Sequence, residues 1–122
     1  MTVRSLFPIL STTDLPRLVE FYRAALAAVV EYRFPDAAGG DAYVALSTGG
    51  GALGIGADPA LEATGDRIAL WFYVDDLDAT HAAALRAGAS EQREPTDMPW
   101  GERVSQVRDP DGNLVNFAEP PT

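Results

Sequence analysis

Residues 68–74 constrain the fold of this chain more than any other stretch. With the period of two of a β-strand, one face carries four large apolar side chains: Ile68, Leu70, Phe72 and Val74. The other face carries Ala69, Trp71 and Tyr73. A strand with one face in water would show polar residues there, whereas two amphipathic aromatic residues suit the lining of a concave site. The stretch therefore predicts a strand with one face in the core and one face lining a concave site.

The elements that follow this strand are marked by caps and turns. Asp75 and Asp76 precede an alanine-rich helix predicted over residues 77–87, which Gly88 ends. A Pro-Trp-Gly loop at residues 99–101 leads into a strand that runs to residue 108. The Asp-Pro-Asp-Gly turn at residues 109–112 connects it to a last strand over residues 113–118.

The first half of the chain gives a similar series. A strand is predicted over residues 5–11, and Asp14 with Pro16 begins an amphipathic helix that extends to about Ala27. The expected strands and loops then follow in order: a strand at 29–34, a loop at 35–40, a strand at 42–48, a glycine turn at 49–51, a strand at 52–56 and a loop at 57–66.

The two halves repeat one order of elements. Asp14-Leu15 begins the first helix and Asp76-Leu77 the second, about half the chain later. Each half is typical of a βαβββ unit. We therefore expect one α+β domain over residues 1–122, with an N-terminal module at 1–58 and a C-terminal module at 67–119.

Composition limits the classes of function. The chain lacks cysteine, which excludes disulfides, a thiolate nucleophile and a cysteine zinc site. Eighteen acidic and nine basic residues give a net charge of −9, which disfavours nucleic acid and anionic membranes. This charge favours a cationic partner, or it serves solubility alone. The sequence shows neither a signal peptide nor an apolar run of the ~18 residues that a membrane span needs, so a cytoplasmic protein is expected.

The order and spacing of several short motifs resemble the vicinal oxygen chelate superfamily, which includes glyoxalase I, extradiol dioxygenases and bleomycin-resistance proteins. The bleomycin-resistance branch is the most similar. The matching pieces are Pro8-Ile-Leu10, Asp14 with residues 19–22, the strand around Trp71, Pro99-Trp-Gly101, and residues 108–113 leading to Phe117. The resemblance implies two βαβββ modules whose partly open sheets form a cup, and a homodimer.

Metal-dependent members of that family hold a divalent ion with His, Gln or Glu from four strands. Counted from local anchors, those positions fall on Phe7, Gly54, Ala69 and Asn116 in this chain. Only Asn116 carries an oxygen that could bind a cation, and a weak one. We therefore expect no metal and no cofactor.

No catalytic residue is predicted. The single histidine, His81, lies in the second predicted helix and is expected to be a surface or half-buried residue. Asp75, Asp76 and Asp78 lie at the start of that helix, where capping and the helix dipole explain them.

The resemblance leaves a cup whose residues suit ligand binding. The expected ligand-binding residues are Phe7, Tyr43, Gly54, Ala69, Trp71, Tyr73, Trp100, Ser105, Leu114 and Asn116, with Ile9 as a further wall residue and Gln106 as the alternative to Ser105. Trp100 is expected to cap the opening. The alternative is that the aromatic residues fill the core, above all for Phe7 and Tyr43.

Three hypotheses follow for the function. The first is a self-protection protein that sequesters a small-molecule antibiotic of bleomycin, mitomycin or enediyne type without altering it, through aromatic stacking and attraction of a cation. The second is a metal-independent isomerase, lyase or cyclase. The third is a domain that retains only the fold.

Overall fold

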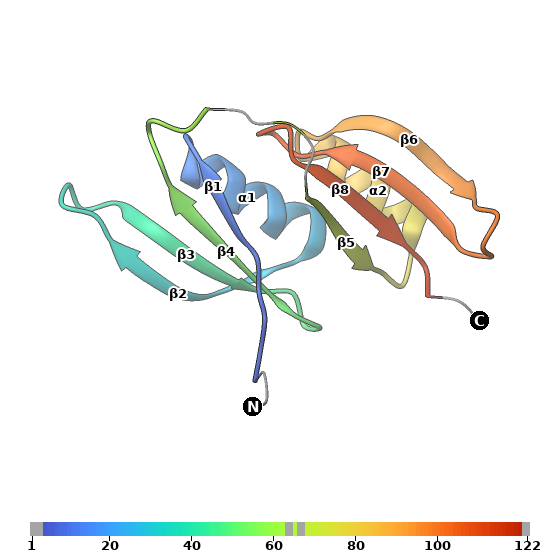
Figure 1. The fold of residues 1–122 in the computed structure, drawn as a ribbon, viewed down its shortest axis with the longest axis horizontal. Coiled ribbons are helices and arrows are strands. Elements are labelled where there is room, and N and C mark those ends of the chain that lie inside the picture. The colour runs from blue at the N-terminus through green and yellow to red at the C-terminus, as the bar shows by residue number, and fades with distance from the viewer. Residues whose placement is uncertain (1–3, 63–64, 66–67, 121–122) are drawn as a thin grey trace. The chain divides into compact units, whose positions relative to one another are not determined.

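The computed structural model describes residues 4–62, 65 and 68–120. Within them the chain forms two compact units, one with strands β1 to β4 and most of helix α1, the other with α2 and β5 to β8 (Figure 1). Neither helix is long and apolar enough to cross a lipid bilayer, within the residues that the structure describes.

The first unit contains one helix and a four-stranded sheet. Its elements are β1 (Ile9–Thr12), α1 (Leu15–Leu26), β2 (Val29–Pro35), β3 (Asp41–Ser47) and β4 (Ala52–Ala57). The strand order in the sheet is β1-β4-β3-β2, and β1 runs parallel to β4 while the other pairs are antiparallel.

Helix α1 begins and ends where the capping residues predict. The Asp14 carboxylate accepts the Arg17 N–H at 3.2 Å, and Pro16 occupies the first turn. Ala27 ends the helix in the left-handed conformation with φ of 53°. The apolar side of the helix, which includes Leu18 and Tyr22, is fully buried.

The second unit repeats this arrangement. Its elements are β5 (Ala69–Tyr73), α2 (Leu77–Arg86), β6 (Ser90–Asp97), β7 (Arg103–Arg108) and β8 (Leu114–Ala118). The strand order in the sheet is β5-β8-β7-β6, and β5 runs parallel to β8, as β1 does to β4 in the first unit. Both units therefore have the order βαβββ, which confirms the predicted α+β fold.

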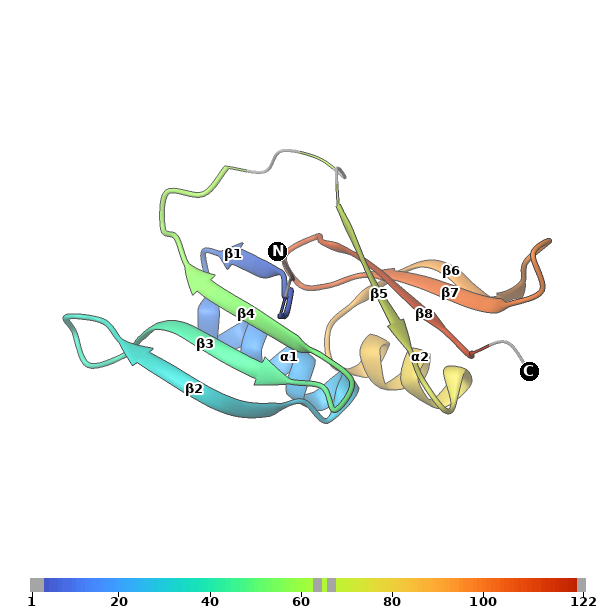
Figure 2. The same ribbon diagram turned by 60° about the horizontal axis from the view of Figure 1, so that its bottom comes forward.

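The core of the second unit lies between α2 and one face of its sheet, as Figures 1 and 2 show. Leu70, Val115 and Val107 are neighbours across β5, β8 and β7 and form a buried row on this face. Leu77, His81 and Ala84 face them from α2 at helical spacing. We call this side of the sheet the α2 face.

Two strands differ from the prediction. Strand β1 begins at Ile9, because residues 5–8 make only part of the expected pairing, through the bond from the Gly54 N–H to the Pro8 carbonyl. Strand β6 had no predicted bounds, and its sequence, Ser90–Asp97, has no apolar alternation. The expected loop at 57–66 and the module boundary at residue 67 lie partly outside the described residues.

Candidate functional site

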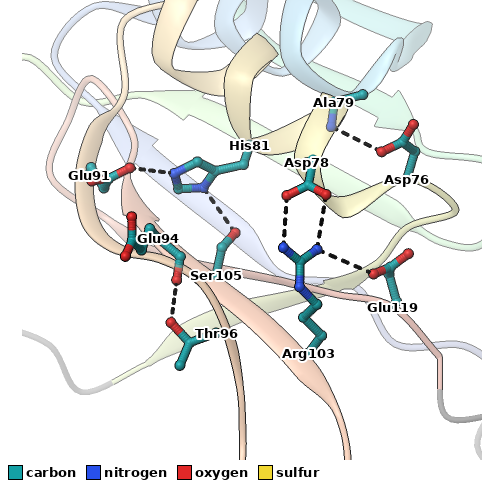
Figure 3. A network of polar contacts seen from close by, with 10 residues as sticks. All are labelled: Asp76, Asp78, Ala79, His81, Glu91, Glu94, Thr96, Arg103, Ser105 and Glu119. Atoms are coloured by element: carbon teal, nitrogen blue, oxygen red, sulfur yellow. Dashed lines mark hydrogen bonds and ion pairs between the residues drawn. The ribbon is translucent and has the colours of Figure 1, made fainter.

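His81 is buried between α2 and two strands of the second sheet (Figure 3). Its Nδ1 lies 3.0 Å from Ser105 Oγ on β7, and its Nε2 lies 2.7 Å from Glu91 Oε2 on β6. Only 6% of His81 is exposed, so the expectation of a surface or half-buried histidine is wrong. Both ring nitrogens have partners from the sheet, which makes this burial possible.

Ser105 belongs to the α2 face and not to the expected ligand site. It pairs with Phe117 across β7 and β8, and no part of it is exposed. Glu91, His81 and Ser105 are residue types that hydrolytic triads use, but a substrate cannot reach a fully buried hydroxyl. The trio connects α2 to β6 and β7, and Ser105 is removed from the candidate binding residues.

The opposite side of the second sheet gathers five of the predicted residues. Ala69 pairs with Leu114, and Trp71 pairs with Asn116, across the parallel strands β5 and β8. Tyr73 follows Trp71 on the same side. Gln106, the alternative to Ser105, pairs with Asn116 from β7 and shares this side. We call this surface the Trp71 face.

Trp71 and Tyr73 present aromatic surface on this face. Their ring centroids lie 6.1 Å apart with the planes at 62°, an edge-on arrangement. The exposed fractions are 43% for Trp71 and 56% for Tyr73. These rings therefore do not fill the core, and they remain open to a ligand.

Two side-chain amides, those of Gln106 and Asn116, form a polar part of the Trp71 face. Gln106 Nε2 donates to Asn116 Oδ1 at 2.9 Å, and Asn116 Nδ2 donates to the Leu70 carbonyl at 3.3 Å. Asn116 is 8% exposed, so its orientation is fixed by these two bonds. Gln106 is the more accessible of the two amides to a ligand.

Glu102 is a site residue that the sequence did not reveal. It directly precedes β7 and continues the alternation of Val104 and Gln106, which places it on the side of Trp71 and Tyr73. Its Oε1 accepts the indole N–H of Trp100 at 2.7 Å. Trp100, in the turn between β6 and β7, is 59% exposed.

The Glu102 carboxylate also perturbs Tyr73. The pKa of Tyr73 is raised above its usual value, first by side-chain hydrogen bonding with Glu102, then by partial desolvation and by the negative charge of Glu102. Tyr73 therefore stays neutral throughout the physiological pH range. Glu102 therefore binds Trp100 directly and raises the pKa of Tyr73.

The first sheet has an aromatic face of its own, which we call the Tyr43 face. Its residues follow from the strand register: Ile9, Tyr32, Phe34, Tyr43 and Gly54. Tyr32 and Tyr43 have ring centroids 6.4 Å apart. Phe7, just before β1, is 44% exposed, whereas Tyr32 and Phe34, which the sequence reading missed, are more than half exposed.

Gly54 lies beneath the Tyr43 side chain. A Cβ atom built on Gly54 would overlap the Tyr43 hydroxyl and lie 2.9 Å from ring atoms Cε1 and Cζ. Gly54 does not have a positive φ, so the backbone would accept a side chain. Glycine is required here by the close approach of the tyrosine ring and not by the chain conformation.

The residues at the four expected metal positions do not fit a divalent ion. Phe7, Gly54 and Ala69 carry no ligand atom, and the Asn116 oxygen already accepts a hydrogen bond from Gln106. Within residues 4–62, 65 and 68–120, no three His, Asp or Glu side chains are grouped as a metal site would require.

The aspartates at the start of α2 have structural partners. Asp76 caps the helix by accepting the Ala79 N–H at 3.1 Å, which confirms the predicted capping role. Asp78, in the first turn, binds the Arg103 guanidinium, a partner that the sequence did not indicate.

Comparison with known proteins gives one family and several relatives. Residues 5–117 match the model of the Glyoxalase/Bleomycin resistance protein/Dioxygenase superfamily. CFP32 of Mycobacterium bovis, named as a candidate glyoxylase, is 31% identical over 109 residues, and so is CFP32 of Mycobacterium tuberculosis. That alignment covers 88% of this chain but only 41% of either relative, so the chain spans about two fifths of their length.

Several solved structures share this fold. TioX from Micromonospora sp. ML1 superimposes with a TM-score of 0.77 at 27% identity, covering 96% of this chain and 98% of TioX. The bleomycin resistance determinant encoded on the transposon Tn5 gives a TM-score of 0.72 at 22% identity, covering 96% and 98% of the two chains. The second likeness concerns the fold alone.

Proposed function

Because the chain belongs to the Glyoxalase/Bleomycin resistance protein/Dioxygenase superfamily, we propose that it binds an aromatic or cationic small molecule and holds it unchanged. The ligand would be a natural product of the bleomycin, mitomycin or enediyne type. Capture is stoichiometric, and a captured drug does not reach its target. The observation that carries this proposal is the pair of half-exposed rings, Trp71 and Tyr73, on the Trp71 face.

The chemistry of this face supports binding over turnover. Its aromatic rings give stacking area, and its amides are fixed by hydrogen bonds to each other and to the backbone. The side chains at the four positions that correspond to the family's metal ligands do not suit a divalent ion. The likeness in fold to a bleomycin resistance determinant agrees with drug binding.

A second candidate function is a metal-independent enzyme of the isomerase, lyase or cyclase type. It is favoured by the effect of the Glu102 carboxylate on Tyr73, whose pKa it raises, since a neutral phenol and a carboxylate can act as an acid and a base. The two CFP32 relatives bear an enzyme name, glyoxylase, which supports catalysis in general. Turnover of a compound in excess over protein would favour this candidate.

We also propose that the protein acts as a homodimer. Several large apolar side chains of the first sheet are exposed, and a two-fold pair of chains is the commonest way to cover such surfaces.

A thermal-shift screen with DNA-damaging natural products tests the capture proposal. A ligand raises the stability of the folded state by RT ln(1 + [L]/Kd), so a hit shows a melting temperature that climbs with ligand concentration. The hit is then titrated calorimetrically and recovered for mass spectrometry. Capture predicts a fixed ratio of ligand to protein and an unchanged mass. A modified compound recovered in excess over protein would replace capture by catalysis.

A further inference from the structure

The Glu102 carboxylate stands among three aromatic side chains. Its Oε1 accepts the Trp100 indole N–H at 2.7 Å, and the carboxylate raises the pKa of Tyr73, whose ring centroid lies 6.1 Å from that of Trp71. All four residues belong to the second unit, so the arrangement depends on no other part of the chain.

One oxygen of this carboxylate lacks a hydrogen-bond partner of its own. Glu102 is partly exposed, unlike the fully buried Ser105, but its Oε2 is covered and forms no hydrogen bond among the described residues. A buried anionic oxygen left unpaired is costly, and native structures satisfy such atoms with a protein donor, a water or a ligand. The group that satisfies it best is a positively charged N–H donor.

The local turn does not explain the carboxylate. The turn is closed by the backbone, through the Met98 N–H to the Glu102 carbonyl at 2.8 Å and the Gly101 N–H to the Met98 carbonyl at 3.0 Å. Gly101, with φ of 98°, supplies the positive φ. A glutamate side chain is not needed for this geometry.

The surrounding rings are suited to a cation. Trp71, Tyr73 and Trp100 expose 43%, 56% and 59% of their surfaces, so their ring faces and edges are accessible. A cation near the face of tryptophan or tyrosine is attracted by the ring quadrupole. The net charge of −9 adds a long-range attraction for the same cation.

Building on the proposed capture function, we propose that Glu102 binds the positive charge of an aromatic amine or guanidine, while Trp71, Tyr73 and Trp100 contact its rings. The required ligand class is then an aromatic molecule with a protonated nitrogen, and a neutral molecule of the same shape binds less tightly.

The test compares two planar dyes on three proteins. Proflavine is a cation at neutral pH, and acridine is a neutral ring system of similar size. Both are titrated against the unmodified protein, Glu102→Gln and Glu94→Gln by fluorescence anisotropy. The Glu102→Gln variant keeps a side-chain oxygen for the Trp100 N–H but loses the charge. Glu94, on β6 and exposed, is the control, since its replacement changes the net charge equally.

The expected result is a loss of about tenfold in proflavine affinity for Glu102→Gln, the size of one charged hydrogen bond, with acridine affinity unchanged. Glu94→Gln should bind both dyes as the unmodified protein does. Circular dichroism confirms that each variant is folded.

Three outcomes would overturn the inference. If the unmodified protein binds proflavine and acridine equally well, Glu102 does not recognise a positive charge. The proposal that the protein captures aromatic ligands would be unaffected by that result. An equal loss of proflavine binding in both variants assigns the effect to net charge alone. If neither dye binds, the inference falls as well, and the natural-product screen then decides on capture separately.

Discussion

Arg103 of β7 binds Asp78 in the first turn of α2 through two parallel hydrogen bonds, each 3.0 Å long (Figure 3). Glu119, after β8, lies 3.7 Å from the same guanidinium. The pKa of Asp78 is lowered, first by hydrogen bonding with Arg103 and then by its positive charge. The pair joins the helix to the sheet on the side away from the Trp71 face.

This pair makes stability depend on pH. Because the pKa of Asp78 is lower in the folded state, its contribution is present above the unfolded pKa of about 4 and is lost as pH falls through the folded value. Asp78→Asn should therefore lower the melting temperature at pH 7, and the difference from the unmodified protein should disappear toward pH 3. Asp75→Asn, an exposed neighbour, is the control. A difference that persists unchanged in acid would contradict this assignment.

Ser105 and Gln106 should respond differently to replacement, because they lie on opposite faces of β7. Ser105→Ala leaves the buried His81 Nδ1 without its partner and should cost about 1–3 kcal/mol of unfolding free energy, with ligand affinity retained. Gln106→Ala should weaken ligand binding with a smaller effect on stability. Denaturant titration measures the stability of both variants, and calorimetry measures their ligand affinity. If Ser105→Ala is fully folded but binds the ligand less tightly, the placement of Ser105 on the α2 face is refuted.

Gly54 and Tyr43 should be strongly coupled. Gly54→Ala forces a methyl group into the Tyr43 ring and should cost about 1–3 kcal/mol in the unmodified background. In the Tyr43→Ala background the ring that the methyl group would meet is gone, and the same change should cost less. A double-mutant cycle by denaturant unfolding gives the coupling energy. Additive effects would mean that the ring moves aside without cost.

Trp71 should contribute to ligand affinity more than to folding, since its ring is 43% exposed. For a hit from the natural-product screen, Trp71→Ala should lower affinity about threefold or more through the lost aromatic contact. Tryptophan fluorescence should be quenched on titration. Leu85→Ala on α2, exposed to a similar degree, serves as the control and should leave affinity unchanged.

The oligomeric state is a further prediction. The edge strand β2 exposes three large apolar side chains: Val29, Tyr32 and Phe34. The edge strand of the second sheet, β6, instead carries polar residues and Pro95, which discourage pairing. We expect a symmetric homodimer by analytical ultracentrifugation at micromolar concentration. A monomeric mass under those conditions would exclude it.

The parts of the fold that the sequence predicts are those with clear periodicity or caps. The alternation of residues 68–74 placed Leu70 in the core and Trp71 and Tyr73 on the opposite side. Its placement of Ile68 on the core face is wrong, because Ile68 lies before β5 and is 79% exposed. Asp14 and Asp76 marked both helix starts, because each carboxylate accepts an N–H three residues later. Strand β6 has no such signal, since its strand conformation comes from pairing with β7.

The errors at the site also have physical reasons. Val104 and Val107 are both fully or nearly buried yet fall on opposite faces of β7, so alternation could not decide between Ser105 and Gln106. The burial of His81 depends on two partners distant in the sequence. Glu102 follows a turn, and nothing local indicates that it continues the strand beside Trp71.

The Tyr43 ring over Gly54 has a consequence for how this chain could change its chemistry. A histidine or glutamate at position 54 would be the first step toward a metal-binding descendant, and the backbone there permits a side chain. That single step would collide with Tyr43 and lower stability before any ligand set existed. We therefore expect an engineered or evolved route to a metalloenzyme to replace Tyr43 by a smaller residue before it introduces a ligand at position 54.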